Sequence, residues 1–280
     1  MTENFSPRPG VLGENGQLAY HYTSRAAAFE HILPTRLLRL GSLATMRDPL
    51  ENKERAEHLF APASWSDEDV EKLRALERDA LANTKILSLT VDRPRDPGVS
   101  EAHAWGYARP RMWEQYAENH VGVCLVFDRD HIHQQALGHL QAINDTAWGE
   151  VIYSDLPLVG YPNARTLDAT TLTVSGDGDT ASGYRAHLQQ NAEELFFRKV
   201  EDWASERELR YVLLDDDDRE VTLPYERLHA LILGERFPSW QLPGAVALGQ
   251  VADATLLKMA WNGLPTLTAR VGHERSESRA

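Results

Sequence analysis

The chain has 280 residues, 42% hydrophobic and 25% charged, a globular composition that excludes a disulfide-stapled miniprotein and a disordered or collagen-like polymer. Its formal net charge of −13 disfavours broad contact with phosphate backbones or anionic membranes, so any nucleic-acid contact must rest on a local patch. The single cysteine, a start without an apolar signal segment and the lack of any run of about 20 apolar residues predict a soluble, cytoplasmic protein with no membrane partner.

Short apolar runs and amphipathic segments follow one another along the chain. A period of two predicts a strand, and a period near 3.6 after Ser or Thr predicts a helix. In chain order these patterns predict a strand at 18–22, a helix at 26–33 ended by Pro34, a strand at 37–43, a helix at 66–83, a strand at 85–91, a short helix at 112–119, a buried strand at 121–127, a strand at 149–155, a helix at 184–199, a hairpin of strands 208–214 and 219–224, a strand at 228–237, a short helix or loop at 242–252, and a pair of undecided type at 255–271.

Three segments are predicted to be less ordered than the rest. Residues 1–17 read as a flexible arm and residues 272–280 as a disordered tail. Residues 161–183 lose apolar periodicity and gain Gly, Asp, Ser and Thr, which predicts a mobile insertion. Strands and helices without regular alternation predict one α+β domain over 18–271, with a mixed central β-sheet flanked by helices.

Tyr20, His21, Tyr22 and Thr23 lie where a predicted strand runs into a helix. Side chains at such a junction project into the space above a sheet edge, where ligands often bind, and the start of the helix favours anionic groups. In the structural alternative, the histidine packs between two tyrosines and the threonine caps the helix.

Glu206, Glu208 and Arg210 share one face if this segment is a strand, because side chains alternate with a period of two. Salt bridges from Arg210, and from Lys199 or Arg198, would explain the two carboxylates structurally. The functional interpretation is a carboxylate that stabilises positive charge developing on a substrate.

Residues 105–113 interleave aromatic and basic side chains, with Tyr107, Arg109 and Arg111 between two tryptophans. Arginines beside stacking rings can hold a phosphate and a base. Packing of cations on rings in a surface loop is the structural alternative.

Two other groups are interpreted as structural. His131, His133 and His139 have no acidic or cysteine partner at metal-ligand spacing, so no metal site is predicted. Cys124 lies in an apolar run with no adjoining cation, which predicts a core position. The sequence contains no phosphate-binding glycine loop, Rossmann fingerprint, serine-hydrolase elbow or zinc-protease helix motif.

A series of motifs occurs in fixed order: YHYTS, LRLGSLATMRDPLEN, LSLTVD, MWEQYAENHVGVCLVFD, VIYSD, FRKVEDWASERELRYV and LILG. Together they resemble the bacterial family catalogued as domain of unknown function 2971. This resemblance spans residues 18–234 and brings no activity with it.

The early His-Tyr-Thr and the late Glu-x-Glu are also similar to the first and last signatures of the ADP-ribosyltransferase superfamily, which includes DNA- and tRNA-directed members. The resemblance implies a split central sheet with NAD as substrate in the cleft. It implies that His21 binds the adenosine-side ribose or pyrophosphate, that an aromatic ring stacks on nicotinamide, and that Glu208 holds the nicotinamide ribose. The middle signature is not placed on one residue, and the choice between Glu206 and Glu208 needs geometry. The residues expected to bind NAD are His21, Tyr22, Thr23, Tyr107, Arg109, Arg111 and Tyr116.

The expected function is transfer of ADP-ribose from NAD to protein or nucleic acid, or NAD hydrolysis, in bacterial defence or toxin–antitoxin biology. Glu208, Glu206 and His21 are the expected catalytic residues, because a fixed carboxylate stabilises the charge that develops on ribose as nicotinamide leaves. A non-catalytic nucleotide or nucleic-acid binding module stays open. So does a metal-dependent nuclease that would use the histidines and Asp48, Glu51 and Asp128.

Overall fold

The computed structural model describes residues 5–7, 12–46, 48, 51, 66–93, 101–155, 180–214, 217 and 219–270. The strands are β1 (Phe5–Pro7), β2 (Leu18–Thr23), β3 (Leu37–Arg39), β4 (Gly41–Ser42), β5 (Thr84–Val91), β6 (Val123–Asp128), β7 (Asp145–Glu150), β8 (Ile152–Tyr153), β9 (Arg198–Lys199), β10 (Glu208–Leu214), β11 (Thr222–Pro224), β12 (Ala230–Leu233), β13 (Thr255–Trp261) and β14 (Pro265–Arg270). The α-helices are α1 (Leu33–Thr35), α3 (Asp67–Asn83), α4 (Glu101–Ala104), α5 (Pro110–Gln115), α6 (Arg129–Leu140), α8 (Thr180–Gln190), α9 (Ala192–Phe196) and α10 (Leu242–Val251). A π-helical turn at Ala27–Ile32 precedes α1, and 3-10 turns occur at Leu43–Thr45, Glu201–Trp203 and Ser239–Gln241. Within these ranges no helix combines the length and the apolar character that crossing a bilayer requires.

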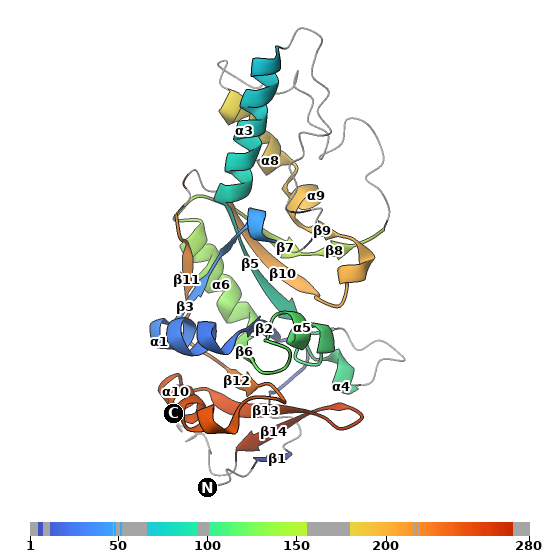
Figure 1. Ribbon diagram of the computed structural model, residues 1–280, viewed down its shortest axis with the longest axis vertical. Coiled ribbons are helices and arrows are strands. Elements are labelled where there is room, and N and C mark those ends of the chain that lie inside the picture. The colour runs from blue at the N-terminus through green and yellow to red at the C-terminus, as the bar shows by residue number, and fades with distance from the viewer. Residues whose placement is uncertain are drawn as a thin grey trace.

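One ten-stranded sheet runs along the molecule, with β14 and β13 towards one end and helices α3 and α8 at the other (Figure 1). Its strand order is β1-β14-β13-β12-β6-β2-β5-β10-β7, and β4 lies beside β5. Neighbouring strands pair antiparallel, except that β12 and β13 pair parallel. The predicted combination of helices with a mixed central sheet is therefore confirmed.

The sheet opens between β2 and β5. Strand β2 pairs with β6 along its whole length but meets β5 only at Ala19↔Val91 and Tyr20↔Thr90. Further along β5, the edge that faces β2 is taken by β4, which pairs with Ile86 and Lys85. A gap therefore forms in the middle of the sheet, beside the central part of β5.

Apolar clusters on both faces of the sheet fix the position of this gap. One face carries Leu89 and its neighbours under α6 and α10. The other face carries two separate clusters, one around Tyr20 and Trp113 near α5, and one around Ile86 and Phe196 below α3, α8 and α9. The gap lies between these two clusters. Apolar side chains of the described residues do not fill it, so polar side chains can line it.

The predicted hairpin of residues 208–214 and 219–224 is wrong. Both edges of β10 are occupied, by β5 and by β7. Strand β11 instead pairs with β3, where Leu223 faces Leu38 and both are buried in the large core cluster. Burial of this apolar strand outweighs the local turn signal of the acidic run.

Several predicted boundaries change. The predicted flexible arm is partly ordered, because Phe5–Pro7 pairs with β14 and Leu12 is buried. The helix predicted at 184–199 is interrupted at Asn191 and ends in strand β9, which pairs with β8. The mobile insertion lies outside the described residues except at 180–183, which form the start of α8, and the predicted disordered tail lies outside them entirely.

The first helical segment continues past Pro34 to Thr35 and ends where Arg36 adopts a left-handed conformation. Ser24, not the expected Thr23, caps its start, since the Ser24 hydroxyl accepts from the Ala27 N–H at 3.1 Å. The pair of undecided type after α10 is strands β13 and β14.

Candidate functional site

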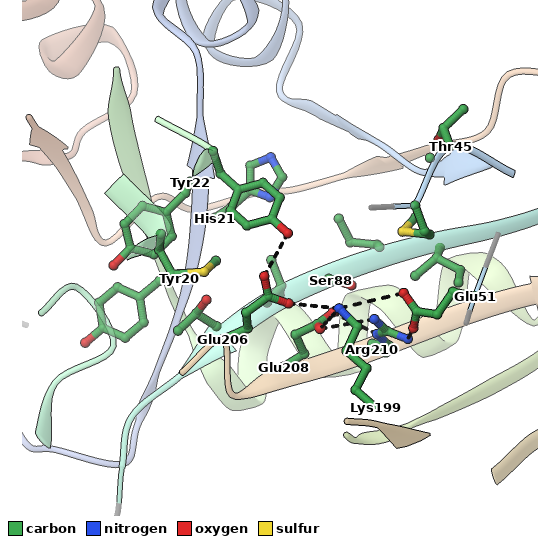
Figure 2. Close-up of a pocket in the computed structure, with 18 of the residues that line it drawn as sticks. Tyr20, His21, Tyr22, Thr45, Glu51, Ser88, Lys199, Glu206, Glu208 and Arg210 are labelled. Atoms are coloured by element: carbon green, nitrogen blue, oxygen red, sulfur yellow. Dashed lines mark hydrogen bonds and ion pairs between the residues drawn. The ribbon is translucent and has the colours of Figure 1, made fainter. Parts of the chain in front are cut away.

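A cavity of about 280 Å³ opens at the gap between β2 and β5 (Figure 2). Its wall consists of β2, the exposed edge of β5, the start of β10 with the turn before it, and single side chains from neighbouring segments. This volume is close to the lower end for small-molecule sites, and it suits one end of a dinucleotide better than the whole.

Three buried carboxylates meet two buried cations on one side of the cavity (Figure 2). Lys199 Nζ lies 2.8 Å from a Glu206 oxygen, 2.7 Å from a Glu208 oxygen and 3.7 Å from a Glu51 oxygen. Arg210 donates to Glu208 through Nε at 2.7 Å and through a terminal nitrogen at 3.1 Å, and its other terminal nitrogen pairs with Glu51. The salt bridges expected from Arg210 and Lys199 are present, and the buried cluster keeps an excess of one carboxylate.

The two glutamates at the start of β10 differ in their surroundings. Burial alone would raise the pKa of Glu208, but Arg210 and Lys199 outweigh it and hold that pKa below its ordinary value. Burial raises the pKa of Glu206, because Lys199 compensates only in part and Glu208 adds like-charge repulsion. Glu208 is therefore a firmly ionised anchor, whereas Glu206 is the carboxyl that takes up a proton more easily.

Hydroxyl groups complete the environment of these carboxyls. Tyr116 donates to Glu206 Oε1 at 2.8 Å, from the segment just after α5. The Glu208 N–H donates to the Tyr153 hydroxyl at 3.0 Å, which holds the first residue of β10 in place. Glu206 thus accepts two hydrogen bonds and Glu208 accepts three, so Glu206 has more acceptor capacity left for a ligand.

His21 lies on the opposite wall of the gap, where its imidazole hydrogen-bonds the backbone of Ser88. Burial lowers the pKa of His21 to about 4, and the bond to Ser88 opposes this only in part. The ring is therefore neutral at pH 7 and occupies the space where the β2–β5 ladder is missing.

Strand β5 contributes two buried hydroxyls to the same face. Ser88 pairs in register with Arg210, and Thr90 pairs with Glu208, so these side chains share the cavity side of the sheet. Both hydroxyls lack a hydrogen-bond partner among the described residues. A bound ligand with hydroxyl or phosphate oxygens would satisfy them.

His21, Glu206 and Glu208 line one cavity from opposite sides, and Tyr22 and Tyr116 line it as well. Tyr22 offers only its ring, because its hydroxyl donates to the Gly106 carbonyl at 2.6 Å. Two of the predicted NAD-binding aromatic residues therefore lie at the cavity.

The cavity wall does not include the other predicted NAD-binding residues, which are Thr23, Tyr107, Arg109 and Arg111. Thr23 is buried in the pairing of β2 with β6. Tyr107 is buried and stacks on Trp105 with 6.1 Å between ring centroids, while the Arg111 guanidinium lies 4.5 Å from the Trp203 ring centroid. Within residues 105–113, Arg111 packs on a ring as the structural alternative expects, and Tyr107 is buried away from the cavity.

The site also contains residues that sequence reasoning assigned no role in NAD binding. Ser88 and Thr90 alternate with apolar residues in the second half of β5, and this alternation was a usable signal. Glu51 and Arg210 are 159 residues apart, so no local pattern links them. Lys199 was predicted only as a salt-bridge partner, although it touches all three carboxylates.

Of the residues in the nuclease alternative, Asp48 and Glu51 are buried next to each other, whereas Asp128 and the histidines lie elsewhere. Asp128 caps α6 by accepting from the His131 N–H at 2.8 Å. His133 contacts the Tyr211 hydroxyl at 3.1 Å, and His139 contacts a backbone carbonyl in β11. These groups do not join Glu51 in the cavity wall. In the part of the chain that the structure describes, no three such side chains form a group that could hold a metal ion.

Residues 112–211 match the family model described as "Protein of unknown function (DUF2971)". This match supports the family resemblance read from the motifs, and it includes the cavity residues Tyr116, Lys199, Glu206, Glu208 and Arg210. Searches of curated proteins and of solved structures gave no significant match.

Proposed function

We propose that this chain is an NAD-dependent ADP-ribosyltransferase, or an NAD glycohydrolase when water is the acceptor. The observation that carries the proposal is the gap in the sheet, where the neutral His21 and the buried pair Glu206 and Glu208 line one cavity from opposite sides. In an ADP-ribosyltransferase-like sheet, the split would lie between the strand that carries the histidine, here β2, and β5, which pairs with the carboxylate strand β10. The arrangement fits such a sheet. Ser88 and Thr90 on the strand between them are candidates for the middle signature.

The chemistry requires a wall that favours positive charge on the substrate. The bond between ribose C1′ and the nicotinamide nitrogen breaks, its electron pair leaves with nicotinamide, and the ribose gains positive charge. A buried cluster with one excess carboxylate stabilises that charge more than it stabilises bound NAD. The acceptor, which is water or a protein or nucleic-acid group, then supplies an electron pair to C1′ and loses a proton.

Within the pair, Glu206 is the better candidate for contact with the substrate. It has free acceptor capacity, its pKa is raised mainly by burial, and the Tyr116 hydroxyl orients it. A carboxylate with a raised pKa also suits uptake of the acceptor's proton. Glu208 fixes Lys199 and Arg210, and in this assignment it acts as a positioning residue.

The test is incubation with labelled NAD, alone and with protein or nucleic acid, followed by measurement of nicotinamide release and of labelled product. We expect Glu206→Gln to lower release on the order of a hundred- to a thousand-fold with NAD affinity retained. Glu118→Gln, on an exposed pair with Arg25, is the matched control and should react like the wild type. If Glu208→Gln is inactive while Glu206→Gln is active, the roles within the pair are reversed.

A non-catalytic nucleotide-binding module is the second candidate, because Lys199 and Arg210 already neutralise most of the charge on the carboxylates. In that case NAD raises the melting temperature but releases no nicotinamide. If NAD neither raises the melting temperature nor reacts with any acceptor, the transferase and NAD binding at this cavity are both rejected.

A further inference from the structure

A second cavity, of about 320 Å³, lies beside the start of β10 and is lined by arginines from three separate segments. Arg93 follows β5, Arg129 begins α6, and Arg207 precedes β10. We call this cavity the arginine pocket. These three arginines line one cavity in a chain with a net charge of −13, whose long-range field disfavours anions.

Two carboxylates, those of Asp92 and Glu150, also line the arginine pocket, but they do not balance the charge of its three arginines. Asp92 directs its oxygens to backbone groups, accepting from the Gly16 N–H at 2.8 Å and from the Gly106 N–H at 2.7 Å. Glu150 lies 2.6 Å from Arg129, and half of its side chain is exposed. The carboxylates are thus fewer than the arginines, and one of them is committed to the loop backbone.

A fourth guanidinium adds to the positive charge near the pocket. Arg109 is more than nine-tenths buried, and one of its terminal nitrogens donates to the His103 carbonyl at 3.2 Å. Its Nε and its other terminal nitrogen have no hydrogen-bond partner among the described residues. Burial lowers the pKa of Arg109, and repulsion from Arg93 and Arg207 adds to this effect.

The backbone at Arg207 is held in an uncommon conformation. Its φ is +43°, in the left-handed region that disfavours a residue with a side chain. The Arg207 carbonyl accepts from the Val91 N–H at 2.9 Å, which ties this turn to β5. As a result Arg207 lines the arginine pocket while its neighbours Glu206 and Glu208 line the first cavity. Strained backbone of this kind persists where the surrounding structure over-determines it.

We propose that the arginine pocket binds a phosphate group. Guanidinium groups bind phosphate oxygens through two parallel hydrogen bonds, and several of them arranged around one cavity provide both charge and geometry. The phosphate belongs either to a free nucleotide or to the end of a nucleic-acid strand. This proposal does not rest on the proposed function, because it concerns other residues and involves no NAD chemistry.

The test is titration of the full chain with inorganic phosphate, then with AMP and with a short 5′-phosphorylated oligonucleotide, followed by calorimetry at low salt. We expect saturable phosphate binding with a dissociation constant on the order of 1 mM or lower. Arg93→Gln and Arg129→Gln should each weaken binding about tenfold, the worth of one charged hydrogen bond. Glu150→Gln should strengthen it, because it frees Arg129.

Arg111→Gln is the matched control, since Arg111 pairs with Asp202 outside the pocket, and it should bind phosphate like the wild type. All the substituted residues are at least partly exposed, and circular dichroism checks that each variant folds. Tighter binding of AMP identifies a free nucleotide as the source of the phosphate, and tighter binding of the oligonucleotide identifies nucleic acid. Absence of saturable phosphate binding, or equal weakening by Arg111→Gln, overturns the proposal whatever the activity with NAD.

Discussion

Replacement of Glu208 by Gln tests the buried charge cluster directly. Glu208 accepts two hydrogen bonds from Arg210 and lies 2.7 Å from Lys199 Nζ. Hydrogen bonds to charged groups contribute about 1.5–3 kcal/mol each, and the Gln carbonyl can keep one of the three. We therefore expect Glu208→Gln to lower the free energy of unfolding by about 3–5 kcal/mol, as when one partner of a buried ion pair is removed. That is a large part of a typical total of about 5–15 kcal/mol.

The same substitution should change the dependence of stability on pH. Arg210 and Lys199 outweigh burial and lower the pKa of Glu208, so its stabilising contribution is present above the ordinary pKa of 4.5 and is lost as pH falls below it. Burial raises the pKa of Glu206, so the folded state takes up that proton first and gains stability as pH falls towards 4.5. Glu208→Gln should flatten the loss of stability in acid, and Glu206→Gln should steepen it, each by up to about 1.4 kcal/mol per pH unit.

Urea unfolding of both variants and the wild type, followed by tryptophan fluorescence at several pH values, measures these quantities. Glu206→Gln is the control for loss of a carboxylate at the same site. A cost below about 1 kcal/mol for Glu208→Gln, which is the range of exposed salt bridges, would contradict the reasoning. A shift of both acid slopes in the same direction would contradict it as well.

Three further changes test other parts of the structure. Folding lowers the pKa of His21 to about 4, so the wild type should lose up to about 3 kcal/mol of stability as pH falls from 6.5 to about 4. His21→Gln should not show this loss, and an unchanged pH profile refutes the reasoning. Tyr116→Phe should slow nicotinamide release about tenfold at a cost of about 1 kcal/mol in stability, and an equal rate shows that its hydroxyl is not needed. Gly106→Ala should cost several kcal/mol by thermal or urea unfolding, since a Cβ would lie 2.3 Å from Tyr20 Cδ2, whereas the control Gly138→Ala in α6 has open space and should stabilise by about 0.5–1 kcal/mol.

Elements with strong local patterns were predictable from the sequence. Helix α3 and strands β5, β6 and β10 match their predicted positions to within a few residues, because amphipathic or continuous apolar runs define them. Strand pairing was not predictable in the same way. β11 follows β10 in the chain but pairs with β3, because pairing depends on which apolar face is left to bury, and this is settled by tertiary contacts.

The candidate site was partly predictable for the same reason. Glu208 and Arg210 meet because the period-two rule places them on one face of a strand, and this rule needs no tertiary information. Residues 105–113 carried an equally clear pattern, yet Tyr107 and Arg109 are buried away from the cavity. The sequence alone does not tell whether the rings of such a segment contact a ligand or pack in the core. This depends on where the segment lies relative to the sheet.

The turn before β10 links the two cavities through the alternation of three consecutive residues. Glu206 and Glu208 line the first cavity and Arg207 lines the arginine pocket, so a single segment presents acid to one cavity and base to the next. The left-handed backbone at Arg207 and its bond to the Val91 N–H fix this separation. In the proposed function, this separation keeps the Arg207 guanidinium away from the excess carboxylate that would stabilise positive charge on the substrate. The strain at Arg207 is therefore understandable as the cost of keeping opposite charges apart on adjacent residues.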